Sequence, residues 1–267
     1  MTGVDRIRRA FEARTGVKVM AHSVCGYPDM ASSSRILEAL ASSGADLVEA
    51  QLPFSDPSAD GPSIVAANGA ALRAGSSTAD CLDALAALRA RTAVPILVMS
   101  YLNPLLAYGI DRLVERARAS GLDGFIVPDY PDDEPELQPG EKCAAAGLAL
   151  VPLVAPSTSL ERAAALASAS ASPFLYVVLR LGVTGRKTEL DGVALERLAA
   201  LKERTGKYIA AGFGLRERSQ VEALAGYADC AIVGSALVDA AREATAAGRS
   251  PAQAVGERLK GLRGGGQ

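Results

Sequence analysis

The sequence of 267 residues predicts an α/β fold, a single (β/α)8 TIM barrel that spans residues 1–267. Short apolar runs recur along the whole chain, and Ala- and Leu-rich segments with helical spacing alternate with them. The runs are continuously apolar, as expected for parallel strands that are covered on both faces. A doubly wound open sheet is the alternative, but Cys25-Gly26-Tyr27-Pro28, after the first run, is not a glycine-rich dinucleotide turn.

Eight apolar runs are the expected strands of this barrel. They cover residues 19–24, 47–52, 96–99, 125–127, 148–154, 174–179, 208–211 and 231–233. The first twenty residues alternate charged and apolar residues at helical spacing, which predicts an N-terminal helix. The other expected helices cover residues 32–43, 63–72, 80–91, 111–119, 160–167, 193–204 and 219–225. Two of them lie between the second and third strands, where an extra helical insertion indicates a functional loop.

The composition excludes several classes of partner. With 49% hydrophobic residues, 22% charged residues and a formal net charge of −2, the chain offers no basic excess for a nucleic acid or an anionic membrane. Neither a secretory apolar segment nor an uncharged apolar run of membrane-spanning length is visible, so we expect a cytoplasmic protein. The four cysteines are far apart, which is neither a zinc pattern nor a disulfide framework.

The stretch of residues 47–64 is the expected reaction centre, because a barrel carries its chemistry at the carboxyl ends of its strands. Glu49 lies inside an apolar strand, where a carboxylate either is paired, titrates at high pH or takes part in chemistry. Asp60 follows in the loop. Its position before Gly61 and Pro62 fits a structural turn or helix cap as well as it fits an active-site acid.

Glycines follow the last three strands, at the same end of the predicted barrel. They lie in Gly182-Val183-Thr184-Gly185, Gly212-Phe213-Gly214 and Gly234-Ser235. Small residues let backbone amides approach an anion, and the helix after each loop adds its positive end. Their coincidence predicts a phosphate site, in the place where this fold usually has one.

The remaining residue types exclude other mechanisms. His22 is the single histidine, which rules out a multi-histidine metal site, and none of the six lysines lies near the carboxyl end of a strand, where a Schiff-base lysine would be desolvated. Two carboxylates near a phosphate site, with Tyr176 as a hydroxyl donor, suit proton transfer on a phosphorylated substrate. We therefore expect neither a cofactor nor a metal.

Several motifs, in this order, resemble the tryptophan synthase alpha subunit family. They are Glu49, Pro53-Phe54-Ser55-Asp56-Pro57, Ala59-Asp60-Gly61-Pro62, Tyr101-x-Asn103-Pro104, Pro128-Asp129, Pro156-Ser157-Thr158, Tyr176, the GVTG run at residues 182–185, Gly212-Phe213-Gly214 and Gly234-Ser235-Ala236. The resemblance extends over nearly the whole chain. It implies a TIM-barrel lyase of tryptophan biosynthesis that cleaves indole-3-glycerol phosphate to indole and glyceraldehyde 3-phosphate by a retro-aldol reaction.

The resemblance also implies roles for single residues. Glu49 is the general acid-base, Asp60 accepts a hydrogen bond from the indole NH, and Thr184 closes on Asp60. The phosphate-binding residues are expected to be Gly185, Gly212, Phe213, Gly214, Gly234 and Ser235. The substrate pocket is expected to include His22, Gln51, Ile64, Met99, Val127 and Asp129. The turn Ser55-Asp56-Pro57 resembles the surface that contacts a beta subunit, in an αββα heterotetramer.

Five positions depart from the family pattern, and they cluster around the expected pocket. His22 replaces Phe or Tyr, Tyr27 replaces Asp, Gln51 replaces Gly, and Leu179 and Leu181 replace small residues. His22 fits either a tolerated aromatic replacement or a change in ligand selection. Gln51 points to the same face as Glu49 and is expected to contact substrate or Glu49. The alternatives are therefore a stand-alone lyase, a relative with a modified substrate, and a catalytically weak activator of a beta subunit.

Overall fold

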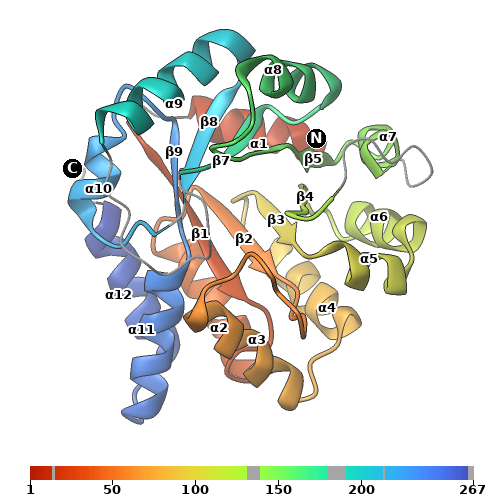
Figure 1. The fold of residues 1–267 in the computed structure, drawn as a ribbon. Coiled ribbons are helices and arrows are strands. Elements are labelled where there is room, and N and C mark those ends of the chain that lie inside the picture. Colours follow the sequence, from red (N-terminus) through yellow and green to blue (C-terminus); the bar gives the residue numbers. More distant parts are fainter. Residues whose placement is uncertain (14–15, 131–138, 180–190, 213, 264–267) are drawn as a thin grey trace.

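The protein is a parallel β-barrel surrounded by helices, as the sequence predicts (Figure 1). The structure, a computed structural model, describes residues 1–13, 16–130, 139–179, 191–212 and 214–263. The strands are β1 (Lys18–Val24), β2 (Leu47–Gln51), β3 (Ile96–Met99), β4 (Gly124–Ile126), β5 (Ala149–Val151), β6 (Leu153–Val154), β7 (Phe174–Val178), β8 (Tyr208–Gly212) and β9 (Cys230–Val233). Their order in the sheet is β5-β4-β3-β2-β1-β9-β8-β7-β6, and every pair is parallel.

The fifth expected strand, residues 148–154, is divided in two at Pro152. Proline has no backbone N–H to donate to a ladder, so strand pairing is interrupted there. β5 pairs with β4, whereas β6 pairs with β7, and the Pro152 carbonyl accepts a hydrogen bond from the Tyr176 amide at 3.0 Å. The two ends of the sheet are thus consecutive pieces of one segment, and the barrel is closed except for this break.

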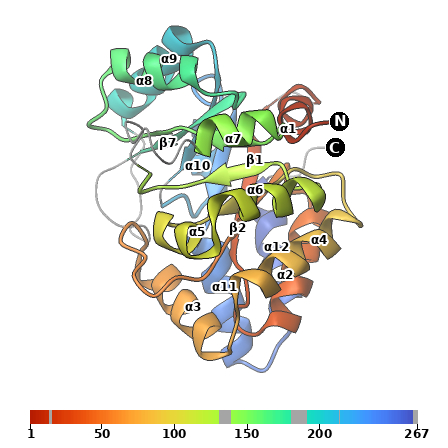
Figure 2. The same ribbon diagram turned by 90° about the vertical axis from the view of Figure 1, so that its right-hand side faces the viewer.

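Helices cover the outside of the strands (Figures 1 and 2). They are α1 (Gly3–Glu12), α2 (Met30–Ser42), α3 (Pro62–Arg73), α4 (Thr78–Arg89), α5 (Leu102–Tyr108), α6 (Ile110–Ala119), α7 (Pro139–Ala145), α8 (Leu160–Ala169), α9 (Gly192–Thr205), α10 (Arg218–Ala223), α11 (Ser235–Ala246) and α12 (Pro251–Arg263). The N-terminal helix and the two helices inserted between β2 and β3 agree with the sequence prediction. The sequence analysis did not anticipate α5, α7, α11 and α12. None of the described helices is long and apolar enough to cross a membrane.

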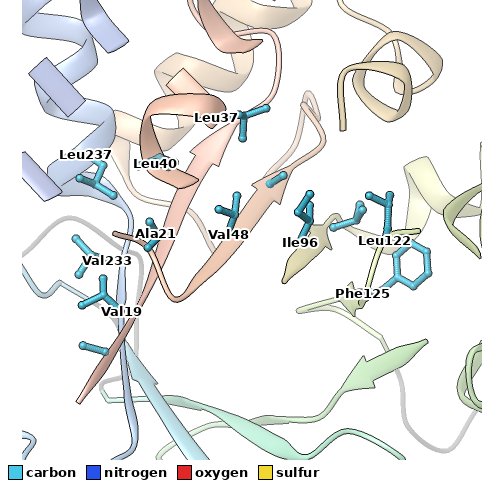
Figure 3. Close-up of a cluster of buried hydrophobic side chains, with 14 of the residues drawn as sticks. Val19, Ala21, Leu37, Leu40, Val48, Ile96, Leu122, Phe125, Val233 and Leu237 are labelled. Carbon is cyan, nitrogen blue, oxygen red and sulfur yellow. The ribbon is translucent and has the colours of Figure 1, made fainter. Parts of the chain in front are cut away.

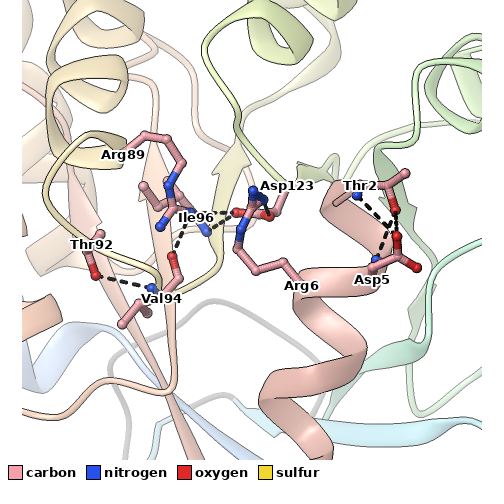
Figure 4. A network of polar contacts seen from close by, with 8 residues as sticks. All are labelled: Thr2, Asp5, Arg6, Arg89, Thr92, Val94, Ile96 and Asp123. Carbon is pink, nitrogen blue, oxygen red and sulfur yellow. Dashed lines mark hydrogen bonds and ion pairs between the residues drawn. The ribbon is translucent and has the colours of Figure 1, made fainter.

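Helix α1 covers the amino end of the barrel. A capping box between Thr2 and Asp5 begins it, and Phe11 stacks on Tyr208 at the start of β8 with ring centroids 4.7 Å apart. Arg6 reaches the fully buried carboxylate of Asp123 at 2.5 Å (Figure 4). This end is thereby closed, which leaves the carboxyl ends of the strands for a site.

Asp123 also joins this closed end to the strands. Its second carboxylate oxygen accepts hydrogen bonds from the Ile96 amide, at 2.7 Å, and from Arg89, at 3.3 Å (Figure 4). Ile96 is the first residue of β3, and Arg89 is the last residue of α4. One buried carboxylate therefore ties α1, α4 and β3 together.

Side chains alternate between two apolar layers, as the pleat of a strand requires. The outer layer packs strand residues such as Val19, Ala21 and Val48 against Leu37 of α2 and Leu237 of α11 (Figure 3). The inner layer fills the barrel with residues that include Met20, Leu47, Leu97 and Phe174. Because His22 and Glu49 follow Met20 and Leu47 by two positions, this alternation turns both polar side chains toward the inside.

Candidate active site

A cavity of about 330 Å3 opens where the strands end at the carboxyl side of the barrel. It brings together predicted site residues from distant parts of the chain. Those in its lining are His22, Glu49, Asp60, Ile64, Met99, Tyr176, Gly214, Gly234 and Ser235. The remaining lining residues include Ile126, Pro128, Leu153, Ala155, Pro156, Thr158, Val178 and Ile232, so most of the wall is apolar. Such a cavity suits an aromatic ring with a few polar groups at defined points.

Glu49 lines this cavity and is 2% exposed. It is paired in register with His22 on the neighbouring strand β1, and the two side chains point to the same face. Nδ1 of His22 is 3.2 Å from Oε1 of Glu49. The other carboxylate oxygen, Oε2, is buried and has no hydrogen-bond partner among the described residues. One oxygen of Glu49 is therefore held, while the other is available to a ligand.

Asp60 lies beside Glu49 in the same cavity, in the loop between β2 and α3. Its amide donates to the Pro57 carbonyl at 3.0 Å, which closes a turn, and its Oδ2 accepts from Nε2 of Gln51 at 2.7 Å. Burial raises the pKa of Asp60, and the hydrogen bond from Gln51 opposes that rise. Asp60 is thus both a turn residue and a member of the cavity lining, although its position in the sequence left these alternatives open.

Gln51 contacts Asp60 rather than Glu49. It is fully buried and lies outside the cavity lining, so it supports the carboxylate from behind. Its carbonyl oxygen is buried without a hydrogen-bond partner in the described part of the chain. The sequence analysis expected a contact with substrate or Glu49, whereas the hydrogen bond formed is with Asp60, in the loop that follows β2.

Two tyrosine hydroxyls approach the carboxylates. Burial, with the nearby charges of Glu49 and Asp60, raises the pKa of Tyr176 well above its usual value, so this phenol stays protonated. Tyr101, which the sequence analysis did not select as a site residue, accepts a hydrogen bond from the Ala59 amide at 3.1 Å and hydrogen-bonds Asp60. Its place in the motif Tyr101-x-Asn103-Pro104, two residues after the third strand, was the available signal. Both tyrosines are therefore neutral hydrogen-bonding groups near the acids.

The predicted phosphate loops follow β8 and β9, and β1 lies between β9 and β2 in the sheet. Gly214 has a positive φ of 84°, and Gly234 precedes helix α11. The first intrahelical bond of α11 runs from the Leu237 amide to the Gly234 carbonyl at 2.8 Å, so the amides of Ser235 and Ala236 precede it and face outward from the helix end. These donors and the positive end of the helix form an anion-binding edge of the cavity.

Of the other predicted phosphate-binding residues, only Gly212 belongs to the described part of the chain. Gly212 lies in β8 and outside the cavity lining; a side chain there would meet the Ile232 side chain at 2.6 Å, so its small size serves close packing of β8 on β9. Thr184, Gly185, Phe213 and the departure at Leu181 lie outside the described residues.

Two expected pocket residues point elsewhere. Val127 packs in the outer layer, and its neighbour Ile126 lines the cavity instead, because adjacent residues of a strand face opposite sides. Asp129 is exposed and accepts a hydrogen bond from the Leu102 amide at 2.8 Å, where α5 begins. The pocket residue expected at Val127 is therefore the preceding residue, Ile126.

The turn predicted to contact a partner is on the surface. Ser55 and Asp56 are exposed and hydrogen-bond each other, whereas Pro57 is buried. The same loop carries Asp60 into the cavity, so a protein bound to this turn would touch the backbone that positions an acid. Among the described residues, no group of three or more His, Cys, Asp or Glu side chains could hold a metal ion.

Comparison with known proteins agrees with this geometry. The family model described as "Tryptophan synthase alpha chain" matches residues 10–263. Proteins of that name from Carboxydothermus hydrogenoformans and Chloroflexus aurantiacus are 39% and 40% identical, over 90% and 88% of this chain and 89% and 90% of theirs. Among solved structures, tryptophan synthase from M. tuberculosis superposes with a TM-score of 0.83 at 34% identity, covering 97% of this chain and 98% of that one. A mutant alpha-subunit from Pyrococcus furiosus also gives 0.83, at 31% identity, with 92% and 98% coverage. The chain belongs to the tryptophan synthase alpha chain family.

Proposed function

We propose that Glu49 and Asp60 carry out the family's reaction, the retro-aldol cleavage of indole-3-glycerol phosphate, in this cavity. As a member of its family the chain is a carbon-carbon lyase of tryptophan biosynthesis. The observation that carries the assignment of residues is the placement of two buried carboxylates in one apolar cavity whose other edge offers backbone amides to an anion. An indole ring fits the apolar wall, and the phosphate fits the amides.

The two acids differ in their surroundings, and this difference supports different roles. Oε2 of Glu49 has no hydrogen-bond partner among the described residues, so this oxygen can deliver a proton to carbon 3 of the indole ring. Asp60 accepts from Gln51 on one oxygen and, as a carboxylate, can accept from the indole NH on the other. Its negative charge then stabilises the positive charge that develops on the protonated ring. Tyr176 stays protonated and serves as a hydroxyl donor to the substrate.

The phosphate is proposed to bind at Gly214, Gly234 and Ser235. Their place in the cavity lining, with α11 beginning at Ser235, supports this assignment. Gly185, Gly212 and Phe213 as phosphate ligands, and Thr184 as the residue that closes on Asp60, remain predictions from the family resemblance. No cofactor or metal enters the proposed reaction, because proton transfer between carboxylates and substrate is sufficient for it.

We further propose that the chain works in the cytoplasm with a tryptophan synthase beta subunit, as an αββα heterotetramer that passes indole to the beta chain. The exposed Ser55-Asp56 turn supports this partner, because the loop continues from it into the cavity as far as Asp60. A beta subunit pressed against this turn would therefore act on the position of an acid.

The test is cleavage of indole-3-glycerol phosphate by the pure chain, with and without a beta subunit, followed by the appearance of indole and glyceraldehyde 3-phosphate. The proposal expects slow cleavage by the chain alone and faster cleavage with the partner. Equal rates in the two conditions would favour a stand-alone lyase. Absence of cleavage in both would refute both lyase assignments and favour a relative with a different substrate or an activator of a beta chain.

A further inference from the structure

His22 and Glu49 form a pair of polar side chains in the lining of the cavity. Nε2 of His22 and Oε2 of Glu49 are both buried, and neither has a hydrogen-bond partner within the described chain. Both residues line the cavity, and His22 is 4% exposed. Their other side-chain atoms, Nδ1 of His22 and Oε1 of Glu49, lie 3.2 Å apart. Buried polar atoms without partners are uncommon, and a substrate that hydrogen-bonds to them would satisfy both.

We propose that His22 is a second catalytic residue, which accepts the glycerol hydroxyl proton through Nε2 while Glu49 protonates carbon 3 of the indole ring. This inference rests on the proposed function, in which Glu49 is the acid that protonates the indole ring. It changes the reaction centre from a single carboxylic acid to a His-Glu pair.

The position of the imidazole relative to the phosphate loop supports this role. A Cβ placed on Gly234 would lie 3.5 Å from atoms of the His22 ring, so the ring lies between the phosphate-binding loop on one side and Glu49 on the other. In the substrate, the glycerol chain connects the indole ring to the phosphate. With the phosphate at Gly234 and Ser235 and the indole near Glu49 and Asp60, that chain and its hydroxyl must pass His22.

The ionisable groups that face His22 favour protonation of its imidazole. Glu49 faces it from β2, Asp60 from the following loop and Tyr176 from β7, while Gly234 contacts it from the end of β9. Burial lowers the pKa of His22, but the two carboxylates raise it further than burial lowers it, so the net shift is upward. His22 therefore accepts a proton more readily than a buried imidazole without acidic neighbours.

The proton transfers balance over one reaction cycle. At the start, His22 is neutral and donates its Nδ1–H to Oε1, while Glu49 carries a proton on Oε2. That proton moves to carbon 3, the hydroxyl proton moves to Nε2, and the O–H electron pair forms the aldehyde C=O. The electron pair of the broken C–C bond restores the indole ring. After the products leave, the imidazolium releases its Nε2 proton to water and the Glu49 carboxylate takes a proton from water on Oε2, which regenerates the starting pair.

The single histidine makes the unmodified protein a direct test. In a 15N-labelled sample, every imidazole signal belongs to His22. The proposal expects a neutral imidazole protonated on Nδ1 at alkaline pH, and a titration whose midpoint coincides with the acid limb of the cleavage rate. An imidazole that is protonated only on Nε2, or that does not titrate while the cleavage rate does, would overturn it.

Variants supply the second arm. H22F keeps an aromatic ring without nitrogen, and we expect its kcat to fall about 10²- to 10⁴-fold, with KM within a few-fold of the wild type. The fall of the rate at the His22 midpoint should be absent, while the fall that belongs to Asp60 remains. In H22A, added imidazole should restore cleavage in proportion to its concentration, whereas M99A, which also opens the cavity wall, should not respond.

Two results separate this inference from the proposed function. If the wild type cleaves the substrate, the role of His22 is refuted by an H22F variant with the kcat and pH profile of the wild type. It is also refuted if added imidazole does not restore cleavage in a folded H22A variant. Neither result would refute the proposed function. Absence of cleavage by the wild type would refute the proposed function itself. Thermal unfolding of each variant verifies that it is folded.

Discussion

Replacement of Gln51 by Met tests whether the electrostatics of Asp60 control the reaction. Met has nearly the volume of Gln, so packing beneath Asp60 is largely kept. The variant loses the 2.7 Å hydrogen bond from Nε2 to the Asp60 carboxylate and also removes the buried carbonyl oxygen that has no partner among the described residues. One substitution therefore separates the support of a catalytic acid from the stability of the fold.

The expected magnitude follows from the type of bond. A hydrogen bond to a charged group contributes about 1.5–3 kcal/mol. If the carboxylate of Asp60 stabilises the cationic ring in the transition state, loss of this bond lowers kcat/KM by about 10- to 150-fold, because about 1.4 kcal/mol corresponds to a factor of 10. The free energy of unfolding should change by less than about 1 kcal/mol, since removal of the unpaired oxygen offsets the lost bond.

The pH dependence of the Gln51→Met variant gives a second, independent prediction, which is the direction in which the pKa of Asp60 shifts. Burial raises the pKa of Asp60 and Gln51 counteracts it, so the variant should raise that pKa further. Because Asp60 acts as an anion, the enzyme is active above the pKa of Asp60 and loses activity as the pH falls through this pKa. Asp60 and His22 both contribute to the loss of kcat/KM at acid pH, and only the fall that belongs to Asp60 should move to higher pH in the variant, while the fall at the His22 midpoint should stay.

Steady-state cleavage between pH 5 and 9 measures both effects, with urea unfolding for stability. Gln220→Met is the matched control, because Gln220 caps α10 away from the cavity lining and its loss should leave the pH profile unchanged. A Gln51→Met enzyme with wild-type kcat/KM and an unmoved acid limb would refute the role given to Asp60.

Three further changes test other parts of the molecule. Gly214→Ala should raise KM with little change in kcat, since the φ of 84° costs an alanine roughly 1–2 kcal/mol in the phosphate loop; an unchanged KM would contradict this. Asp123→Asn should lower the free energy of unfolding in urea by about 3–5 kcal/mol, because it breaks buried ion pairs with Arg6 and Arg89, and a loss below about 1 kcal/mol would argue against it. Asp56→Lys should weaken stimulation by a beta subunit but not cleavage by the chain alone, and full stimulation would remove the turn from the interface.

The barrel was predictable because its strands are continuously apolar and alternate with helices, a pattern that depends on local sequence. The division of the fifth strand was not anticipated, although Pro152 was visible, because the run of residues 148–154 is apolar throughout. Helix α12 was missed although Val255, Leu259 and Leu262 have the spacing of one helix face, whereas helix α11 lacks such a stripe. Buried residues lie on several sides of α11, so it has no narrow apolar stripe to reveal its period.

The site was predictable where burial and strand position determine it. Glu49 could be predicted because a carboxylate is unusual inside an apolar strand. In the structure this carboxylate lines the cavity. Asp60 could not be assigned from its position, since a turn acid and a catalytic acid have the same neighbours in sequence. The contacts of His22 with Glu49 and of Gln51 with Asp60 depend on strand register and on the path of a loop, which are set by packing across the barrel.

Single-turnover cleavage of indole-3-glycerol phosphate by Glu49→Gln tests the central assignment most directly, with the affinity for glyceraldehyde 3-phosphate measured on the same sample. The variant keeps the shape of the side chain and loses its acid-base function, while Gly214, Gly234 and Ser235 are untouched. We expect turnover to fall by about 10²- to 10⁴-fold and the affinity for the phosphate product to stay within about twofold, because the amide donors remain. Turnover equal to that of the wild type would show that Glu49 is not the catalytic acid.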